Sequence, residues 1–542
     1  MSSLLLGMGI VAIILTLAAI SSRLVERAPV SFPIIFLGIG FLLGNYGVIE
    51  MDTHSPLLEA VALISLALVL FLDAVNTQMD ELKSEWYVPV ATLGPGTLLT
   101  ITGVALAAYY LVGVTPLQAV LLGAVLASTD PVVLRDIVRE QHVPRSVRRA
   151  LSVEAGMNDL VVLPIVLILI ALLTNQSMGV WGWADFLLRI LVLSPLVGLT
   201  VGGIGSWLIG QVDRRMGISR EYQALYGIGL VFASFVAGQA LGGDGFLSAF
   251  FGGLAVTLLN ITLCDCFMEY GETTAEMMML LAFVLFGAVL SGLLMTVPLA
   301  GGLALAAIAL LVVRPAALGL VLLPAKMSNL ARAFIGWFGP RGLNSLLLAL
   351  LAVQAGVPGG EYLLAVTGTV VTVSVVLHGV TATPISAWYG RRVEESIPTL
   401  PEEREGTFPG LFEEEPKAIP LISPAELAAA LKSDDPPVVL DVRARARYES
   451  DNTQIPTSIR VLPDQVADWA NNLDPDEIDK DKLIVVYCSC PDDATSMRVT
   501  RQLLDMGFKA RALQGGFDAW KAQYPVEPKG VPTPPMPVTL EV

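Results

Sequence analysis

The chain has 542 residues, of which 54 % are hydrophobic and 15 % are charged, and its mean hydropathy is +0.68. A soluble protein of this length would have to expose very large apolar patches, so the composition excludes a soluble globular fold and indicates a polytopic membrane protein. The net charge of −16 argues against a nucleic-acid partner, and most of it lies after residue 392, where 15 Lys and Arg face 27 Asp and Glu.

Apolar runs of about 18 residues or more predict membrane-spanning helices. Thirteen such runs lie near 4–22, 29–49, 57–76, 88–112, 117–138, 147–174, 186–210, 219–241, 244–263, 275–295, 297–323, 328–354 and 362–389. The Lys and Arg between runs all follow odd-numbered runs, whereas the loops after even-numbered runs contain none, which places the odd loops in the cytoplasm. We therefore expect a multi-pass protein of a bacterial cytoplasmic (inner) membrane with its N-terminus outside and its C-terminal region in the cytoplasm.

Two of the expected helices are interrupted near their middle. Asp130-Pro131 breaks the fifth helix and Gly339-Pro340-Arg341-Gly342 breaks the twelfth. Proline removes a backbone hydrogen bond there and opens the helix. If the first six and the last six helices are repeats separated by the seventh, the second repeat is inverted and the two broken helices correspond. Such a pair would surround a small-ion site, although two unrelated proline kinks are the alternative.

Three carboxylates lie in segments expected inside the bilayer, namely Asp130, Glu154 and Asp159. A charge at that depth costs at least about 2.5 to 3.5 kcal/mol, so such residues usually mark an ion or proton pathway. Sodium prefers oxygen ligands, and Asp159, Asp130 and the hydroxyl of Thr129 form a plausible sodium site. Protons and the cation would compete for the same carboxylates, which is sufficient for antiport and needs no cofactor. Asn158 precedes Asp159 on the same expected helix.

These residues resemble those of a known family. Thr129-Asp130-Pro131, Glu154 with Asn158-Asp159, and Gly339-Pro340-Arg341-Gly342 are similar in order and spacing to the monovalent cation/proton antiporters of the sodium/proton exchanger family. The resemblance covers roughly residues 1–392 and implies a six-helix core domain that holds the ion and moves against a dimerisation domain in a homodimer.

The same resemblance implies different roles for the polar residues. It implies a structural ion pair between Glu154 and Arg341, and it makes Asp159 the ion carrier. Electrogenic relatives have a second Asp at the position of Asn158, so the amide predicts electroneutral exchange. Asn158 would then orient neighbouring carboxylates, or serve only in helix packing. Arg314, which precedes Pro315, is expected to make a separate structural pair.

The region after residue 392 differs in character. We expect an acidic linker over 393–420, a compact α/β domain over 421–530 with buried parallel strands, and a Pro-rich tail over 531–542. Three segments, Leu440-Asp441-Val442-Arg443, Val486-Tyr487-Cys488 and Gly515-Gly516-Phe517-Asp518-Ala519-Trp520, resemble a rhodanese-like domain.

The resemblance places Cys488 in the nucleophile position of this domain. The loop that follows, Cys488-Ser489-Cys490-Pro491-Asp492-Asp493, has Asp493 where rhodaneses have an anion-binding Arg. Negative charges there should raise the pKa of the thiol and repel anionic substrates, so classical sulfurtransferase activity is not expected. Cys490 would permit a redox or persulfide role, and a regulatory or purely structural domain is the other alternative.

The leading hypothesis is therefore a sodium (or lithium)/proton antiporter with a cytoplasmic rhodanese-like domain. Potassium/proton exchange is an alternative within the transporter class, because the sequence does not reveal ligand spacing. A membrane-tethered sulfurtransferase or a redox-sensing rhodanese protein is the alternative from another class.

Overall fold

The computed structural model describes the parts of the chain whose placement is defined. These are residues 9, 16, 32–76, 87–130, 134, 143–174, 179–216, 218–259, 265–325, 327–394, 419–433, 436–443, 448, 451–461, 466–471, 482–489 and 494–529. The chain divides into two compact units, Met1–Phe412 and Glu413–Val542. Each unit is described by itself below.

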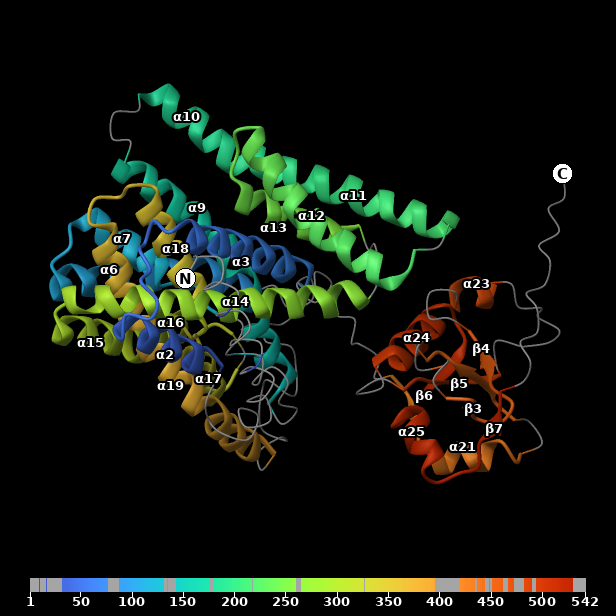
Figure 1. Ribbon diagram of the computed structural model, residues 1–542. Helices are drawn as coiled ribbons and strands as arrows, with labels where there is room; N and C mark the ends of the chain where they lie inside the picture. The colour runs from blue at the N-terminus through green and yellow to red at the C-terminus, as the bar shows by residue number, and fades with distance from the viewer. Residues whose placement is uncertain are drawn as a thin grey trace. The chain divides into compact units, whose positions relative to one another are not determined.

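The regular secondary structure of the first unit's described residues is all helical (Figure 1). Its α-helices are α2 (Phe32–Asn45), α3 (Pro56–Val75), α5 (Tyr87–Ala91), α6 (Thr97–Val112), α7 (Pro116–Val125), α9 (Arg145–Thr174), α10 (Val180–Leu188), α11 (Ser194–Met216), α12 (Arg220–Ala240), α13 (Gly245–Leu258), α14 (Asp265–Leu293), α15 (Leu299–Ile308), α16 (Arg314–Val321), α17 (Asn329–Trp337), α18 (Leu343–Gln354) and α19 (Gly360–Glu394). Short turns of other helix types join some of them: η1 (Thr92–Gly96), η2 (Arg189–Leu193), η3 (Leu294–Thr296) and η4 (Ala309–Val313).

Helical segments occur at twelve of the thirteen expected spans, and the first span, near 4–22, falls almost entirely outside the described residues. Within the described residues, 8 helices are long and apolar enough to cross a membrane. The helices Phe32–Asn45, Pro116–Val125, Gly245–Leu258 and Leu343–Gln354 are apolar but shorter. Two of these short helices, α7 and α18, lie beside the predicted breaks, because the chain leaves the helical path there.

The helices of this unit contact one another in two groups. In the first group α14 packs on α2 and α3, and α13 packs on α3, α11 and α12. In the second group α6 packs on α7 and α15, α19 packs on α15 and α18, and α9 packs on α7. The second group contains six of the expected spans, which are the fourth to sixth and the eleventh to thirteenth. Both broken helices belong to it.

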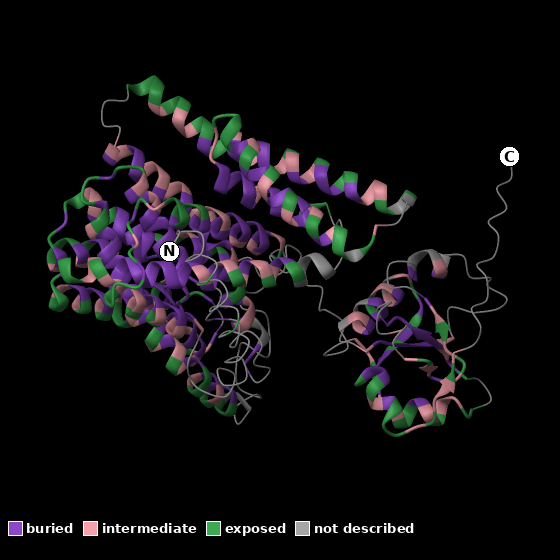
Figure 2. Ribbon diagram, in the orientation of Figure 1, coloured by how far each residue is buried: buried purple, intermediate pink, exposed green. Residues whose placement is uncertain are grey.

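Burial follows this packing (Figure 2). Helices α7 and α18 are mostly buried, whereas α10 has no buried residue. The helix formed by α10, η2 and α11 exposes large apolar side chains, including Trp181, Ile204 and Trp207. In a membrane protein such a face is compatible with lipid contact.

Three π-helical turns widen helices of the first unit. They are η1, η2 and η4, and each has a proline inside it or just after it. Proline cannot donate the usual backbone hydrogen bond, and an extra residue in the turn accommodates the defect. The turns redirect the residues that follow, and Thr97 comes directly after η1 as Arg314 does after η4.

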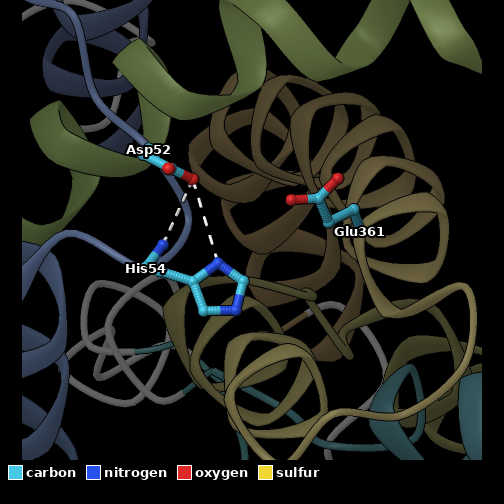
Figure 3. A group of neighbouring side chains, drawn as sticks. All are labelled: Asp52, His54 and Glu361. Atoms are coloured by element: carbon cyan, nitrogen blue, oxygen red, sulfur yellow. Dashed lines mark hydrogen bonds and ion pairs between the residues drawn. The ribbon is translucent and has the colours of Figure 1, made fainter.

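A polar contact joins the two groups of helices. The loop before α3 belongs to the first group, and its buried Thr53 donates from Oγ1 to Oε1 of Glu361, in the first turn of α19, at 2.8 Å. Figure 3 shows the neighbours Asp52 and His54 beside Glu361, with His54 Nδ1 3.9 Å from Asp52 Oδ1. Asp52 also accepts the backbone N–H of His54, which lowers the pKa of its carboxyl. These contacts fix the loop against α19.

The second unit is an α/β domain, as expected. Its strands are β1 (Leu421–Ile422), β2 (Val438–Asp441), β3 (Thr453–Gln454), β4 (Ile459–Arg460), β5 (Leu483–Tyr487), β6 (Lys509–Leu513) and β7 (Glu527–Pro528). Its helices are α21 (Pro424–Ala430), α23 (Val466–Asn471), α24 (Ala494–Asp505) and α25 (Gly516–Lys521). The main sheet is parallel in the order β1-β6-β5-β2-β4, and β3 pairs antiparallel with β7.

A buried charged network closes one end of this sheet. Arg443 Nη2 lies 2.6 Å from Asp441 Oδ2, and Tyr487 donates from its hydroxyl to the same oxygen at 2.9 Å. At the surface, Lys521 Nζ pairs with Asp451 Oδ2 at 2.5 Å. This contact, together with the hydroxyl of Thr453, lowers the pKa of Asp451 far below its usual range.

Candidate functional site

The two helix breaks meet each other inside the second group of helices. Helix α7 begins with a capping box at Thr115 and ends at Val125, and the chain then runs without regular structure to Asp130. The backbone N–H of Asp130 donates to the carbonyl of Pro340 at 2.9 Å. Its carboxylate Oδ2 accepts, at 2.8 Å, the N–H of Leu343, which is the first residue of α18. Asp130 therefore caps the helix that follows the opposite break, where an anion is favoured.

Arg341 binds the end of the other broken helix. Its Nη1 donates to the carbonyls of Ala127 at 3.0 Å and Ser128 at 3.1 Å, which have no helical partner because α7 has ended. Its backbone N–H donates to Ser374 Oγ of α19 at 2.7 Å. The guanidinium is 1 % exposed, so it serves as an internal cross-link between the breaks.

Asp159 lies on α9 with both carboxylate oxygens bound. Ser128 donates from Oγ to Oδ1 at 2.7 Å, and Asn344 of α18 donates from Nδ2 to Oδ2 at 2.7 Å. Both donors are neutral, and within the described part of the chain no Lys or Arg forms an ion pair with this carboxylate. The negative charge of Asp159 is therefore hydrogen-bonded but uncompensated by these residues.

The partner of Glu154 differs from the expected one. Sequence comparison had implied Arg341, but the structure pairs Glu154 with Arg314, through Nη1 to Oε1 at 2.7 Å and Nη2 to Oε2 at 3.1 Å. Arg314 also donates to the carbonyl of Phe338 at 3.0 Å, at the start of the second break. The expected Glu154–Arg341 pair is therefore wrong, because Arg314 binds the Glu154 carboxylate and Arg341 is bound to backbone carbonyls. The separate expectation of a structural pair for Arg314 is confirmed.

Two glycines of the second break are required by close approach. A Cβ on Gly339 would overlap the guanidinium of Arg314, and a Cβ on Gly342 would overlap the carboxylate of Asp130. Either side chain would therefore displace a buried charged group. The break is shaped to hold both groups, which explains why glycine occurs on each side of Pro340-Arg341.

Among the described residues, two buried oxygens beside the site have no hydrogen-bond partner. They are Thr129 Oγ1 and Asn158 Oδ1. The amide nitrogen of Asn158 is 3.5 Å from Thr97 Oγ1, at the end of η1. A buried polar atom without a partner is costly, and oxygen atoms of this kind are the ligands that a hard cation prefers. Their presence near Asp130 and Asp159 is compatible with an alkali cation as transported substrate.

Sequence reasoning identified the carboxylates but missed part of their surroundings. Asn344 and Thr97 were not predicted, and nothing in their local sequence distinguishes them from packing residues. The proline that follows η4, Pro315, was a visible signal for Arg314, since a proline after an apolar run marks a distorted helix.

A carboxylate in this setting can exchange a proton for a cation. It must be neutralised before it crosses a low-dielectric barrier, and either species can do so. Glu154 is already neutralised by Arg314, and Asp130 is committed to the end of α18 by one oxygen. Among the described residues, an arginine pairs with Glu154, whereas Asp159 is bound by neutral donors.

Comparison with known proteins identifies this arrangement. The family model described as the transmembrane sodium/hydrogen exchanger matches residues 11–388. The chain belongs to this family. It is a monovalent cation/proton antiporter, a transporter with several membrane spans. A model of the rhodanese-like domain matches residues 423–523, so the second unit has a rhodanese-like fold.

Individual relatives support the same conclusion. The chain is 29 % identical over 423 residues to the K(+)/H(+) antiporter NhaP2 of Shewanella sp. (strain MR-4), covering 75 % of this chain and 70 % of that protein. It is 25 % identical over 399 residues to the K(+)/H(+) antiporter NhaP of Alkalimonas amylolytica, covering 72 % and 69 %. The sodium proton antiporter MjNhaP1 of Methanocaldococcus jannaschii has a similar fold, with a TM-score of 0.61 at 19 % identity, over 71 % of this chain and 99 % of that one.

In the rhodanese-like unit, the predicted nucleophile position is buried. Cys488 directly follows β5, is 1 % exposed and is disulfide-bonded. Its Sγ lies 3.6 Å from Ser496 Oγ, and its carbonyl accepts the N–H of Phe517. Cys490, Asp492 and Asp493, on which the loop argument depends, lie outside the described residues.

Proposed function

We propose that Asp159 is the carboxylate that the cation and the proton share during exchange. The observation that carries this proposal is the pair of neutral donors, Ser128 and Asn344, on a buried carboxylate without an ion-pair partner among the described residues. A hydroxyl can rotate to offer a lone pair, and an amide has an oxygen beside its nitrogen, so both can release the carboxylate when a cation arrives. Thr129, Asn158 and Asp130 would supply further oxygens.

The transported cation is proposed to be potassium, with sodium or lithium as the second candidate. The names of the relatives from Shewanella and Alkalimonas support potassium. Sodium was expected from the sequence, with potassium kept as an alternative, because the sequence does not reveal the spacing of the oxygen ligands. Both cations are bound by carboxylate, hydroxyl and carbonyl oxygens.

The exchange is proposed to be electroneutral. Asn158 stands beside Asp159 and carries no titratable proton, so one cation replaces one proton at a single carboxylate. A membrane potential imposed with a second ion and its ionophore should leave the steady-state gradient unchanged. A gradient that follows the potential would contradict a one-for-one cycle.

The proposal for Asp159 is tested by Asp159→Asn in proteoliposomes that contain a pH-sensitive dye, with potassium, sodium and lithium added in turn. The amide keeps the shape of the side chain but can hold neither a proton charge nor a cation, so exchange should be lost without loss of folding. A matched control is Asp244→Asn, because Asp244 is half-buried in the first group of helices and caps α13 through the N–H of Leu247. Asparagine also caps helices well, so this control should transport.

Two outcomes would count against the site. Cation-driven proton flux that survives Asp159→Asn would refute the assignment. Loss of flux in both variants, with both proteins folded, would show that the assay reports general damage to the membrane unit rather than chemistry at Asp159.

We propose that the rhodanese-like unit regulates transport and faces the cytoplasm of a bacterial inner-membrane homodimer. Disulfides are rare in the bacterial cytoplasm, so the bonded state of Cys488 suggests a redox response. Deletion after residue 393 should preserve antiport but alter its dependence on thiol reagents. Unchanged transport in the truncated protein under oxidising and reducing conditions would refute regulation.

Catalysis by this unit is tested separately. The isolated segment 421–530 contains two hydrophobic clusters of its own and is expected to fold. We expect negligible sulfur transfer from thiosulfate to cyanide, measured with and without a reductant. Transfer that disappears in Cys488→Ser would show that the unit is an active sulfurtransferase.

A further inference from the structure

A buried histidine lies next to the second break but outside the carboxylate site. His378 is on α19, is 2 % exposed and contacts none of the three carboxylates through a hydrogen bond or an ion pair. The charged groups that act on its ring are the guanidinium groups of Arg314 and Arg341. A buried imidazole in a membrane helix needs a reason, because most polar groups at such positions have a defined partner or function.

The ring contacts one end of the break directly. His378 Nε2 is 3.1 Å from the carbonyl of Trp337, the last residue of α17. That carbonyl also accepts the N–H of Gly339 and has no further helical donor, because the helix has ended. A carbonyl only accepts, so this contact requires the ring hydrogen on Nε2, whereas the contact of Nδ1 with the carbonyl of Ser374 at 2.9 Å would require it on Nδ1. A neutral ring has one such hydrogen, and we assign it to Nε2, where it binds the end of α17.

The same ring reaches the other end of the break through one side chain. With the hydrogen on Nε2, Nδ1 is an acceptor, and Ser374 Oγ lies 3.1 Å from it and can donate. Ser374 Oγ in turn accepts the backbone N–H of Arg341 at 2.7 Å. His378 thus links residues 337 and 341, which flank the central part of the break.

This link is connected to the proposed ion site by short contacts. The side chain of Arg341 holds the carbonyl of Ser128, and the hydroxyl of Ser128 donates to Asp159. The N–H of Asp130 donates to Pro340 within the break itself. A shift of the break by a few tenths of an ångström would therefore change the geometry at Asp159, since the residues between are closely packed.

We propose that His378 is a positioning residue for cation binding. It does not contact the ion; it holds both ends of the second break in the geometry that the oxygen ligands require. The proposal rests on the assignment of the ion site to Asp159. It concerns the neutral ring with its hydrogen on Nε2, which donates to Trp337 and accepts from Ser374 Oγ.

The test measures the cation concentration for half-maximal exchange and the maximal rate, for the full-length protein in proteoliposomes. His378→Ala removes both hydrogen bonds and should raise the half-maximal concentration about tenfold while changing the maximal rate less than about twofold. His378→Gln retains an N–H that can reach Trp337 and should restore most of the affinity. Ser374→Ala removes the acceptor of the Arg341 N–H and should resemble His378→Ala.

A matched control and a double variant complete the design. Ser386 is on the same helix, is 3 % exposed and has an Oγ without a hydrogen-bond partner, so Ser386→Ala should behave as wild type. His378→Ala combined with Ser374→Ala should cost less than the product of the two single effects, because the residues act as one unit.

The outcomes separate this proposal from the ion-site assignment. A half-maximal concentration in His378→Ala equal to that of Ser386→Ala would refute the proposal, as would a fall in maximal rate alone. If His378→Ala does not fold, His378→Gln and Ser374→Ala are measured instead. A wild-type half-maximal concentration in Ser374→Ala would then refute the link from His378 through Ser374 to Arg341. If Asp159→Asn is inactive and the His378 variants keep the wild-type half-maximal concentration, only the positioning role is refuted. If Asp159→Asn is active, the ion-site assignment is refuted.

Discussion

The partner of Glu154 gives the sharpest test of the structure, because the sequence and the structure name different arginines. Arg314 makes two hydrogen bonds to the Glu154 carboxylate, and both side chains are at most 4 % exposed. Removing one member of such a pair leaves an uncompensated buried charge, at a cost of about 3 to 5 kcal/mol. Glu154→Gln and Arg314→Met should each lower the thermal unfolding midpoint strongly.

The double variant should recover much of that loss. Replacing both members by neutral groups of similar size removes the unpaired charge, and such replacements are often close to neutral. We therefore expect a coupling energy of about 2 kcal/mol or more between Glu154 and Arg314, within the range for residues in direct contact. The assay is thermal unfolding of the detergent-purified protein, monitored by tryptophan fluorescence and by size-exclusion chromatography after heating.

The second arginine is the control for this cycle. Arg341 donates to backbone carbonyls rather than to Glu154, so Arg341→Met should destabilise the protein whether or not residue 154 is charged. Additive effects of Glu154→Gln and Arg314→Met, together with strong coupling of Glu154→Gln to Arg341→Met, would refute the pairing seen in the structure.

Three further predictions follow from single contacts. Asn344→Ala removes a hydrogen bond to the charged carboxylate of Asp159 and should raise the half-maximal cation concentration about tenfold in a transport assay; an unchanged value would exclude a role of the amide in ion binding. Gly342→Ala would force a Cβ into the carboxylate of Asp130, so the yield of folded protein after detergent extraction should fall well below that of Gly38→Ala, where a Cβ has open space. In the isolated rhodanese-like unit, the lowered pKa of Asp451 contributes stability that is fully present above the usual aspartate pKa of about 3.9 and is lost as the pH falls below it. In Asp451→Asn, the thermal unfolding midpoint should therefore fall less steeply than in wild type as the pH is lowered through this range.

Much of the architecture could be predicted from the sequence, because hydrophobic length and proline position act locally. The membrane helices follow from apolar runs, and the two breaks follow from Asp130-Pro131 and Gly339-Pro340. The α/β order of the second unit follows in the same way from short buried strands such as Leu483–Tyr487.

The pairing of side chains could not be predicted, because it depends on how distant helices meet. Arg314 and Arg341 both lie in apolar segments, and the sequence does not show that Arg314 reaches Glu154 while Arg341 binds the carbonyls that follow α7. Asn344 is another such case, since an amide in an apolar helix has no sequence feature that names Asp159 as its partner.

The backbone hydrogen bond between Asp130 and Pro340 has a consequence for selectivity. A cycle that separated the two breaks would disrupt this bond, the cap on Leu343 and the contacts of Arg341 together, at about 1 kcal/mol or more each. Moving the second group of helices as one body would instead break contacts between the two groups, such as that of Thr53 with Glu361. The oxygens around the cation would then keep the same mutual distances on both sides of the membrane. The order of preference among alkali cations should therefore be the same in right-side-out and inside-out vesicles, and a reversed order would show that the breaks separate.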